Sequence, residues 1–545
     1  MQRTNKANTK LLQKVKPTHI KPAKSWFFVL GSCFVLSLSA CSTLPKQQQI
    51  KPEYAFDIDT KETALAKIIQ PLKEKNPELT GYHVLYDPLE AIAARINLIE
   101  KAEKTLDLQY YIRDNDKIGS LALYKIIEAA DRGVKVRLLI DDNNAGKMEG
   151  VYLALDQHAN IEVKLFNPYR FRSVRPLDIA LDLKRMNRRM HNKTFTADNQ
   201  ISLIGGRNMS NQYYNVSDNY QFSDVDVMLA GQAVDDITHS FDEYWNHSYA
   251  YPVRNVVDHD KYNLRYEGLK QQLTHHYQEI TVQNYLDLSN RTHDFDQWLN
   301  HNIQLDWVKA EVVKDSPDKI RDKAKKEQHL NFQMVNRLDI PKEDVDLISA
   351  YFVPQKNGEK KLIELANEGV KVRVLTNSFK ANDVALVHAF YAKYRKDLLK
   401  NGVELYEFLP AVSEQNLYAN SKEISKKAKV SLKGLSRSSL HAKLMAVDHK
   451  QVFIGSFNFD PRSANLNTEI GVIINSPPLA NAVHQTMDEN LSKHAYKLVL
   501  DAQQKINWLK ETPQGTVILR KEPKMKWWQK AGVKIISWLP IEGFM

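Results

Sequence analysis

A pattern of polar residues occurs twice in this chain with identical spacing. It reads histidine, one residue, lysine, four residues, aspartate, six residues, glycine, two residues and asparagine. The first copy consists of His191, Lys193, Asp198, Gly205, Gly206 and Asn208, and the second of His441, Lys443, Asp448, Gly455, Ser456 and Asn458. Composition alone predicts far fewer than one such match by chance. We therefore expect two long segments of the chain to adopt the same structure.

The sequence around the two copies repeats as well. "GVKVRLLIDDNN" begins at Gly133 and "GVKVRVLTNSF" at Gly369, and each follows an amphipathic helical stretch. Strands are predicted before these helices, at 104–112 and 344–354, and after the glycine segments, at 161–168 and 403–410. Such alternation predicts an α/β fold with largely parallel pairing, and the repeat is too long for a solenoid. We expect two homologous lobes, each a mixed β-sheet flanked by helices, related by a pseudo-two-fold axis with the active site between them.

The domain boundaries follow from this repeat. The chain of 545 residues is too long for one compact core. The first lobe is predicted at 81–250 and the second at 341–500. Between them, 251–340 is charged and polar and lacks clear periodicity, so it is predicted to be a connecting insertion, part helical and part loop.

The first 40 residues have the features of a signal peptide. A basic region precedes fifteen mostly apolar residues, Trp26 to Ala40, which are fewer than the roughly 20 that a bilayer span requires. "LSAC", ending at Cys41, resembles the bacterial lipobox, in which the cysteine is lipidated. The alternative is a soluble periplasmic protein with a chance cysteine. We predict a membrane-anchored lipoprotein facing the periplasm, with a tether over 41–80, and Ser42 after the cysteine favours the outer membrane.

Charge and cysteine content exclude some classes of function. The net charge of +11 falls to +4 without residues 1–40, which hold seven basic residues and no acidic one. This mild excess does not indicate a nucleic-acid partner. The two cysteines are Cys33, in the apolar stretch, and Cys41, so the mature fold has no disulfide and no thiol-ligated zinc site.

The repeated polar residues suit the chemistry of a phosphodiester. In a strand, residues i and i+2 share a face, so each histidine lies beside its lysine, and glycines in the following turn allow a ligand to approach the backbone. Two facing copies offer two histidines, two lysines and two asparagines around one point. The lysines and amides would bind non-bridging oxygens while one histidine attacks phosphorus and the other protonates the leaving oxygen, without need of a metal. A lone histidine is usually a core residue and a lone lysine usually extends to solvent, but the repetition favours a site.

These motifs resemble those of the phospholipase D superfamily, the HxKx4D family, and within it the bacterial cardiolipin synthases of the C type. The resemblance runs from about residue 80 to the end. It rests on the segments "LLIDDNNAGKMEG", "LIGGRNMSNQYY", "SDVDVML", "FDEYWN", "LHAKLMAVD" and "GSFNFDPRSANLNTEIGV".

The resemblance implies a phosphohistidine intermediate, no metal and no other cofactor. It also implies a carboxylate that orients each histidine through its other ring nitrogen. Glu469 in "NTEIGV" matches this position in the second copy, and Asp224 is its counterpart in the first. The family more often uses the N-terminal histidine as the nucleophile, which indicates His191.

Other members of the pattern are predicted to have lesser roles. Asp198 and Asp448 are included among the site residues, more as structural partners than as direct catalysts. Gly206 and Ser456 are predicted to bind substrate. Because these two differ, the site is not symmetric, and the serine hydroxyl can serve only one side of the phosphate.

The C-terminal tail, 501–545, mixes lysines with tryptophans and aliphatic residues in "RKEPKMKWWQKAGVKIISWLPIEGFM". This composition is typical of a helix at a membrane interface and also occurs in the C-type synthases. The alternative is an ordinary amphipathic helix packed on the lobes.

The leading functional hypothesis is phosphatidyl transfer between two phospholipids, which gives cardiolipin. The same site could transfer the group to water, as a phospholipase D that releases phosphatidic acid. Two further alternatives are a nuclease and a non-catalytic lipoprotein that binds anionic lipids. The expected partners are phospholipid substrates and the membrane surface, through the lipid anchor and the tail, and no nucleic acid.

Overall fold

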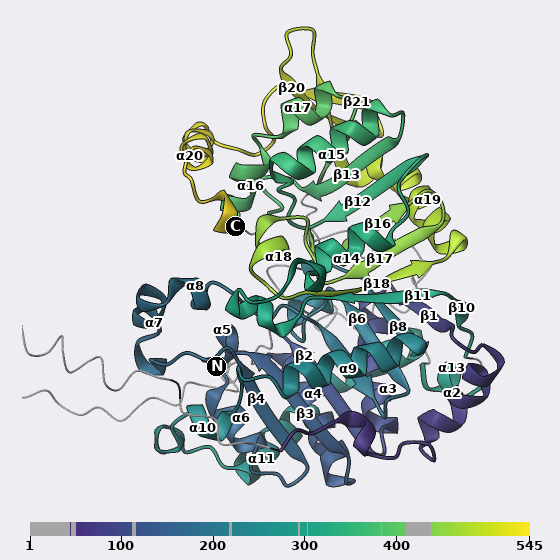
Figure 1. Cartoon of the computed structure of the whole chain (residues 1–545), viewed down its shortest axis with the longest axis vertical. Helices are drawn as coiled ribbons and strands as arrows, with labels where there is room; N and C mark the ends of the chain where they lie inside the picture. Colours follow the sequence, from purple (N-terminus) through teal and green to yellow (C-terminus); the bar gives the residue numbers. More distant parts are fainter. Residues whose placement is uncertain are drawn as a thin grey trace, which may run out of the picture.

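Two large β-sheets, one in each lobe, form the framework of the protein (Figure 1). The structure is a computed structural model that describes residues 44, 51–111, 116–216, 221–292, 295–301, 303–382, 384–409 and 438–544. The predicted signal peptide and Cys41 lie outside these residues.

The sheet of lobe 1 has nine strands in the order β10-β1-β8-β6-β5-β2-β3-β4-β9. Their bounds are β1 Thr80–Leu85, β2 Thr105–Tyr110, β3 Lys135–Asp141, β4 Ile161–Phe166, β5 Thr194–Ala197, β6 Ile201–Gly205, β8 Asp226–Gly231, β9 Ala250–Pro252 and β10 Asp306–Val308. The helices beside this sheet include α3 Pro88–Lys101, α4 Lys117–Asp131, α6 Glu149–Leu155 and α9 Gln232–Trp245.

The sheet of lobe 2 has ten strands in the order β11-β18-β17-β16-β12-β13-β14-β19-β20-β21. Their bounds are β11 Ala310–Lys314, β12 Asp344–Ser349, β13 Lys371–Asn377, β14 Glu404–Phe408, β16 Lys443–Val447, β17 Gln451–Gly455, β18 Ile470–Asn475, β19 Ala495–Leu500, β20 Ile506–Thr512 and β21 Gly515–Leu519. Its helices include α15 Gln355–Asn367, α16 Ala385–Tyr391, α18 Pro461–Asn465, α19 Pro477–His494 and α20 Trp527–Ser537. Strand for strand, the order from β18 to β19 repeats that from β8 to β9, which confirms the predicted α/β fold with two mixed sheets.

Parallel pairing is less extensive than predicted. Within the two large sheets of the described residues, the pairs in β2-β3-β4 and β12-β13-β14 are parallel and the others are antiparallel. A separate two-stranded sheet pairs β7 Gln221–Ser223 of lobe 1 with β15 Ser438–Leu440 of lobe 2, also in parallel. Each His-Lys strand continues into the next strand through a three-residue turn, and so short a connection permits only antiparallel pairing. The repeated glycines serve the helix–strand connections: Gly133 and Gly369, with φ of 98° and 93°, follow the ends of α4 and α15.

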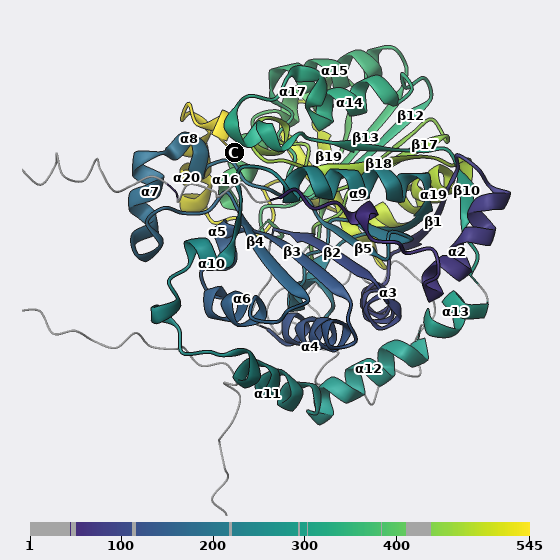
Figure 2. The same cartoon turned by 60° about the horizontal axis from the view of Figure 1, so that its bottom comes forward.

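The connecting insertion is more ordered than its sequence indicated. It contains β10 and β11, which pair with edge strands of lobe 1 and lobe 2 respectively. It also contains α11 Tyr266–Tyr277, α12 Ile280–Thr292 and α13 Phe295–His301, which lie along the outside of lobe 1 (Figure 2). Each strand is three to five residues long, too short for a clear periodic signal.

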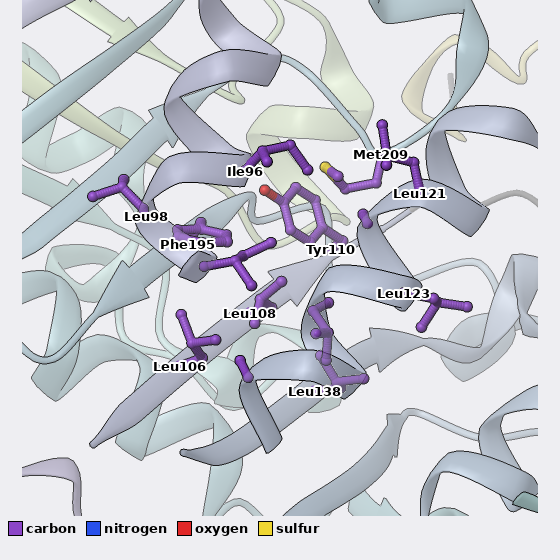
Figure 3. Packing of buried hydrophobic residues seen from close by; sticks show 14 of the residues in the cluster. Ile96, Leu98, Leu106, Leu108, Tyr110, Leu121, Leu123, Leu138, Phe195 and Met209 are labelled. Carbon is purple, nitrogen blue, oxygen red and sulfur yellow. The ribbon is translucent and has the colours of Figure 1, made fainter. Parts of the chain in front are cut away.

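Hydrophobic side chains cover one face of the central strands, and buried charged pairs such as Arg137–Asp107 and Arg373–Asp346 lie on the other. In lobe 1, residues of β2 pack with α3, α4 and β5, as Figure 3 shows for Leu106, Leu108, Leu121 and Phe195. A second cluster takes side chains from both lobes, among them Val227 of β8 and Val472 of β18. This shared core fixes one lobe against the other, so residues from both can form one site.

Candidate active site

The turns that begin at the two repeated aspartates explain part of the motif. Asp198 and Asn199 have φ of 47° and 54°, and Asp448 and His449 have φ of 49° and 52°. Asp198 accepts backbone hydrogen bonds from residues 103–105, and Asp448 from residues 342–344, at 2.8–3.1 Å. Each aspartate thus secures the start of the neighbouring strand. Each lies five residues beyond its lysine, about 16 Å along an extended chain, so both have a structural place away from the histidines.

The two histidines lie just before the strands rather than inside them. β5 begins at Thr194 and β16 at Lys443. The backbone N–H of His191 donates to Thr468 O of lobe 2 at 2.8 Å, and that of His441 donates to Ser223 O of lobe 1 at 2.7 Å. The end of each His-Lys segment is therefore held by the opposite lobe.

The residues that follow these two carbonyls are the predicted carboxylates. Glu469 of lobe 2 lies 2.8 Å from Nδ1 of His191 in lobe 1. Asp224 of lobe 1 lies 2.5 Å from Nδ1 of His441 in lobe 2. Each carboxylate therefore serves the histidine of the other lobe, and neither lobe contains a complete histidine–carboxylate pair.

Glu469, Asp224 and His441 are buried and His191 is largely buried, which determines the charge states of the two pairs. Burial raises the pKa of a carboxyl group, but His191 and Lys193 hold the pKa of Glu469 below its ordinary value, and His441 and Lys443 do the same for Asp224. Burial, together with the nearby lysines, lowers the pKa of His191 to about 4 and also lowers that of His441. Each ring is therefore neutral at pH 7 beside an ionised carboxylate.

These charge states fix the tautomer of each imidazole. An ionised carboxylate can only accept a hydrogen bond, so Nδ1 of His191 carries the proton. Nδ1 of His441 lies 2.9 Å from Lys443 Nζ and 2.5 Å from Asp224 Oδ2, and the shorter contact with the carboxylate places the proton on the same nitrogen of this ring. The unprotonated Nε2 of a neutral ring holds a lone pair, as a nucleophile requires.

The lysines lie beside their histidines. Lys193 Nζ donates to His191 O at 2.7 Å, and Lys443 Nζ donates to His441 O. Lys193 is only 2% exposed, and burial, with the charge of Lys443, lowers its pKa to about 7. Two cations held together in a buried site favour an anionic ligand between them.

Gly206 and Ser456 differ because each accommodates a different carboxylate. The hydroxyl of Ser456 is buried and donates to Glu469 Oε2 at 2.5 Å. A Cβ on Gly206 would lie 2.1 Å from Asp224 Oδ1, so only glycine leaves room for that carboxylate. Both positions therefore shape a carboxylate in this structure, and contact of either residue with substrate stays a prediction.

The asparagines extend the same asymmetry. Asn208 Nδ2 donates to the hydroxyl of Tyr213 at 2.9 Å, and this hydroxyl lies 3.4 Å from His441 Nε2. Tyr213 follows Asn208 by five residues, as Ser463 follows Asn458. The Ser463 hydroxyl instead donates to Glu469 Oε1 at 2.9 Å. Asn458 is buried, and within the described residues its Oδ1 has no hydrogen-bond partner.

The structure thus brings together most of the predicted site residues. The group at the lobe interface consists of His191, Lys193, Asn208, Asp224, His441, Lys443, Asn458 and Glu469, with Gly206 and Ser456 beside the carboxylates. Asp198 and Asp448 lie apart. Sequence analysis missed Tyr213 and Ser463, although extending the alignment five residues past each asparagine would have identified both. It also missed Tyr111, whose ring lies edge-on to His191 at 5.1 Å.

Comparisons with known proteins identify the family and support the fold of the chain. A family profile described as cardiolipin synthase, PLD-like domain matches residues 96–245 and 334–491. Cardiolipin synthase C of Escherichia coli (strain K12) is 40% identical over 488 residues, covering 88% of this chain and 99% of that protein. An uncharacterized protein of Helicobacter pylori (strain ATCC 700392 / 26695) is 30% identical, over 79% of this chain and 83% of its own. The solved structure of phosphatidylserine synthase from Haemophilus influenzae Rd KW20 has a similar fold, with a TM-score of 0.53 and 14% identity, covering 88% of this chain and 100% of that one.

Proposed function

The chain belongs to the cardiolipin synthase PLD-like family of the phospholipase D superfamily, and we propose that it joins two phospholipids to make cardiolipin. The observation that carries this proposal is the crossed pairing of His191 with Glu469 and of His441 with Asp224 beside two buried lysines. It supplies two differently placed imidazoles and an anion site, as a two-step transfer of a phosphatidyl group requires.

In the first step, His191 Nε2 attacks phosphorus of the donor phospholipid. The nitrogen–phosphorus bond forms as the bond from phosphorus to the departing alcohol oxygen breaks, and His441 gives its proton to that oxygen. The proton is available because an anionic phosphodiester opposes the charge of the lysines and favours protonated His441. Lys193 and Lys443 stabilise the charge that builds on the non-bridging oxygens.

In the second step, the hydroxyl group of a second phospholipid, such as phosphatidylglycerol, attacks the phosphohistidine. Its proton passes to neutral His441, its oxygen bonds to phosphorus, and the bond to His191 breaks. Both histidines return to their starting states. Use of water instead would release phosphatidic acid, so the acceptor decides between synthase and phospholipase.

The two histidines differ in a way that supports these roles. Glu469 is held by the hydroxyls of Ser456 and Ser463, which fixes the carboxylate that orients His191. His441 Nε2 instead faces the Tyr213 hydroxyl, a group that can exchange a proton with it. A fixed, neutral ring suits the nucleophile, and a ring with a hydroxyl neighbour suits the acid and base.

Two exposed apolar segments support docking on a membrane. In lobe 1, exposed aliphatic side chains gather on α7 Arg175–Leu181 and α8 Leu183–Met186. In lobe 2, α20 exposes tryptophans between lysines. Both views place α7, α8 and α20 on one side of the molecule (Figures 1 and 2). The set of exposed side chains is Val174, Leu177, Ile179, Leu181, Leu183, Trp527, Trp528, Ile535, Trp538 and Leu539.

This side of the molecule adjoins the active site. Arg462 of α18, in the motif that contains Asn458, donates to Asn187 just after α8. The last turn of the chain, Glu542–Phe544, packs against α18. The two apolar segments would therefore touch a bilayer from which a phospholipid enters between the lobes.

Lipidation of Cys41 would add an anchor, and with it attachment to the periplasmic face of the outer membrane. Along the described ranges, no helix has the length and apolarity to cross a bilayer. Labelling with radioactive palmitate tests the anchor, since it should fail in Cys41→Ala.

Lipid mass spectrometry in a host without cardiolipin tests the function. Expression of the chain should produce cardiolipin, and His191→Ala, expressed at the same level, should produce none. Purified protein on mixed vesicles identifies the donor and acceptor. Phosphatidic acid without cardiolipin would reject the synthase in favour of the phospholipase. Cleavage of plasmid DNA in EDTA would favour a nuclease, and lipid binding without turnover a non-catalytic protein.

A further inference from the structure

A cluster of metal-ligand side chains lies in lobe 2 at the opposite end of β16 from the catalytic lysine. It consists of Asp344 at the start of β12, His449 in the turn after β16, and His484 on α19. Their ligand atoms all lie within 4.8 Å of one another. Each Nε2 lies 2.8 Å from one oxygen of the Asp344 carboxylate.

The Nδ1 atom of each imidazole already has an oxygen acceptor. His484 Nδ1 lies 2.7 Å from Asp346 Oδ2, and His449 Nδ1 lies 2.6 Å from Asn481 Oδ1. An oxygen acceptor on Nδ1 places the proton there and leaves Nε2 as the ligating atom, the arrangement found around histidines that bind metals in proteins. Asp346 is itself fixed by Arg373.

His484 also has a buried nitrogen without a hydrogen bond. Its side chain is only 3% exposed, and its Nε2 and Asp344 Oδ1 make no hydrogen bond of acceptable geometry within the described residues, despite their separation of 2.8 Å. A buried polar atom in this state is costly unless a ligand satisfies it. His449, with a side chain 41% exposed, leaves the cluster open to solvent.

The fold itself does not require this cluster, because lobe 1 lacks it. Helices α9 and α19 can be aligned at Asp242 and Asp488, because each of these aspartates pairs with the buried arginine at the equivalent position of its own lobe. The equivalent residues in lobe 1 are Thr105 for Asp344, Asn199 for His449 and Thr238 for His484. Two imidazoles and a carboxylate thus occur on one copy of a duplicated framework.

We propose that Asp344, His449 and His484 bind a divalent transition metal of the Zn²⁺ class. Imidazole and carboxylate ligands suit Zn²⁺, with water from the open side as the fourth ligand. The two nitrogen–oxygen distances of 2.8 Å would lengthen to about 3.3 Å, the edge of a tetrahedron with zinc distances. The metal would join β12, the turn after β16 and α19, away from the catalytic residues, and so would stabilise lobe 2 without entering the reaction.

The test is Zn²⁺ binding to the full chain without a histidine tag, after removal of metal with EDTA. Calorimetry should give one Zn²⁺ per chain, and added Zn²⁺ should raise Tm. Exchange of each ligand for its lobe 1 equivalent, His449→Asn or His484→Thr, should lower affinity at least about tenfold. His494→Ala, at the end of the same helix, is the matched control and should bind as the wild type does.

Two further results keep the proposal open to refutation. His449→Asn places asparagine in a left-handed turn that favours it, so its metal-free Tm should equal that of the wild type. The double variant His191→Ala/His441→Ala should still bind one Zn²⁺. Absence of stoichiometric binding, unchanged affinity in both exchanges, or loss of binding in the catalytic double variant would overturn the site.

Discussion

At the scale of residues, compensation between neighbours explains why the two halves of the site differ. The shorter Asp224 lies against Gly206, where any side chain would collide with it, and the longer Glu469 receives the hydroxyl of Ser456. The difference between Gly206 and Ser456 therefore matches the difference between the two carboxylates. Tyr213 differs in the same way from its equivalent Ser463: its hydroxyl lies near the ring of His441, whereas that of Ser463 donates to Glu469.

Tyr213→Phe removes the hydroxyl that lies 3.4 Å from His441 Nε2. We expect kcat to fall roughly tenfold to a hundredfold, because one or two well-placed hydrogen bonds to the catalytic group are lost, and KM to change little. Steady-state transfer on vesicles measures it. The matched control is Tyr214→Phe, whose buried hydroxyl donates to the sulfur of Met209 at 3.6 Å and, among the described residues, makes no hydrogen bond with either catalytic histidine. Equal activity of the two variants would contradict a role for Tyr213 in the reaction.

The low pKa of Lys193 predicts that kcat/KM falls above neutral pH. Burial lowers its pKa to about 7, and a lysine is charged only below its pKa, so the free enzyme loses a phosphate-binding charge as pH rises through that value. His191, with a pKa of about 4, stays neutral above that pH. For a water-soluble phosphodiester, kcat/KM should therefore be largest between about 4 and 7.

The profile of kcat should extend to higher pH than that of kcat/KM. A bound phosphate anion favours the charged form of Lys193 and so raises its pKa in the complex. If kcat/KM instead holds constant up to pH 9, Lys193 keeps an ordinary pKa despite its burial, and this account of the lysine is wrong.

At the scale of elements, the C-terminal helix is distinguished by what it leaves exposed. Trp527 and Trp538 of the α20 region are 83% and 73% exposed, although Ile536 nearby packs on lobe 2. One face of the helix therefore secures it to the protein while the other carries aromatic rings and lysines outward. That composition suits the boundary between lipid headgroups and acyl chains.

The double variant Trp527→Ser/Trp538→Ser should bind anionic vesicles about tenfold or more weakly, because it lacks the two indole rings that would insert at the lipid interface. Co-sedimentation measures the effect. Val517→Ser/Ile518→Ser alters exposed apolar residues on the β20–β21 hairpin and is the matched control. If both double variants bind equally well, α20 is an ordinary surface helix.

At the scale of the whole molecule, the active site depends on the way the lobes face each other. Each catalytic histidine takes its backbone support and its carboxylate from the opposite lobe. A shared hydrophobic core maintains this arrangement. The two lobes are therefore similar in structure, but neither is expected to be active alone, because each histidine is in one lobe and its carboxylate is in the other.

The crossed pairing predicts which variants should behave alike. Glu469→Gln should resemble His191→Ala and form little phosphohistidine, because His191 loses its tautomer control, with kcat reduced by about 10²–10⁴. Asp224→Asn should resemble His441→Ala, accumulating an adduct on His191 from a substrate with a good leaving group, because breakdown lacks its base. Rapid-quench mass spectrometry at neutral or basic pH, where phosphohistidine survives, distinguishes them.

The reverse assignment, with adduct lost in Asp224→Asn and retained in Glu469→Gln, would make His441 the nucleophile. Absence of any adduct in all four variants would remove the covalent mechanism.

The sequence by itself determined the duplication, the α/β class and most of the polar residues at the lobe interface. These follow from local properties: strand and helix periodicity, glycines after helices, and spacing within one segment of about 20 residues. The same locality explains its errors. The short strands β10 and β11 of the insertion are ordered by pairing with β1 and β18, which lie far from them in the sequence. The extent of parallel pairing likewise depends on which strands become neighbours in each sheet.

Only the tertiary structure decided how the two copies combine. The crossing of Glu469 to His191 and of Asp224 to His441 joins residues more than 200 positions apart, which no spacing within either copy records. The cluster of Asp344, His449 and His484 likewise joins a strand start, a turn and a helix. Local sequence specifies which side chain each element presents, whereas the packing of apolar faces determines which side chains meet.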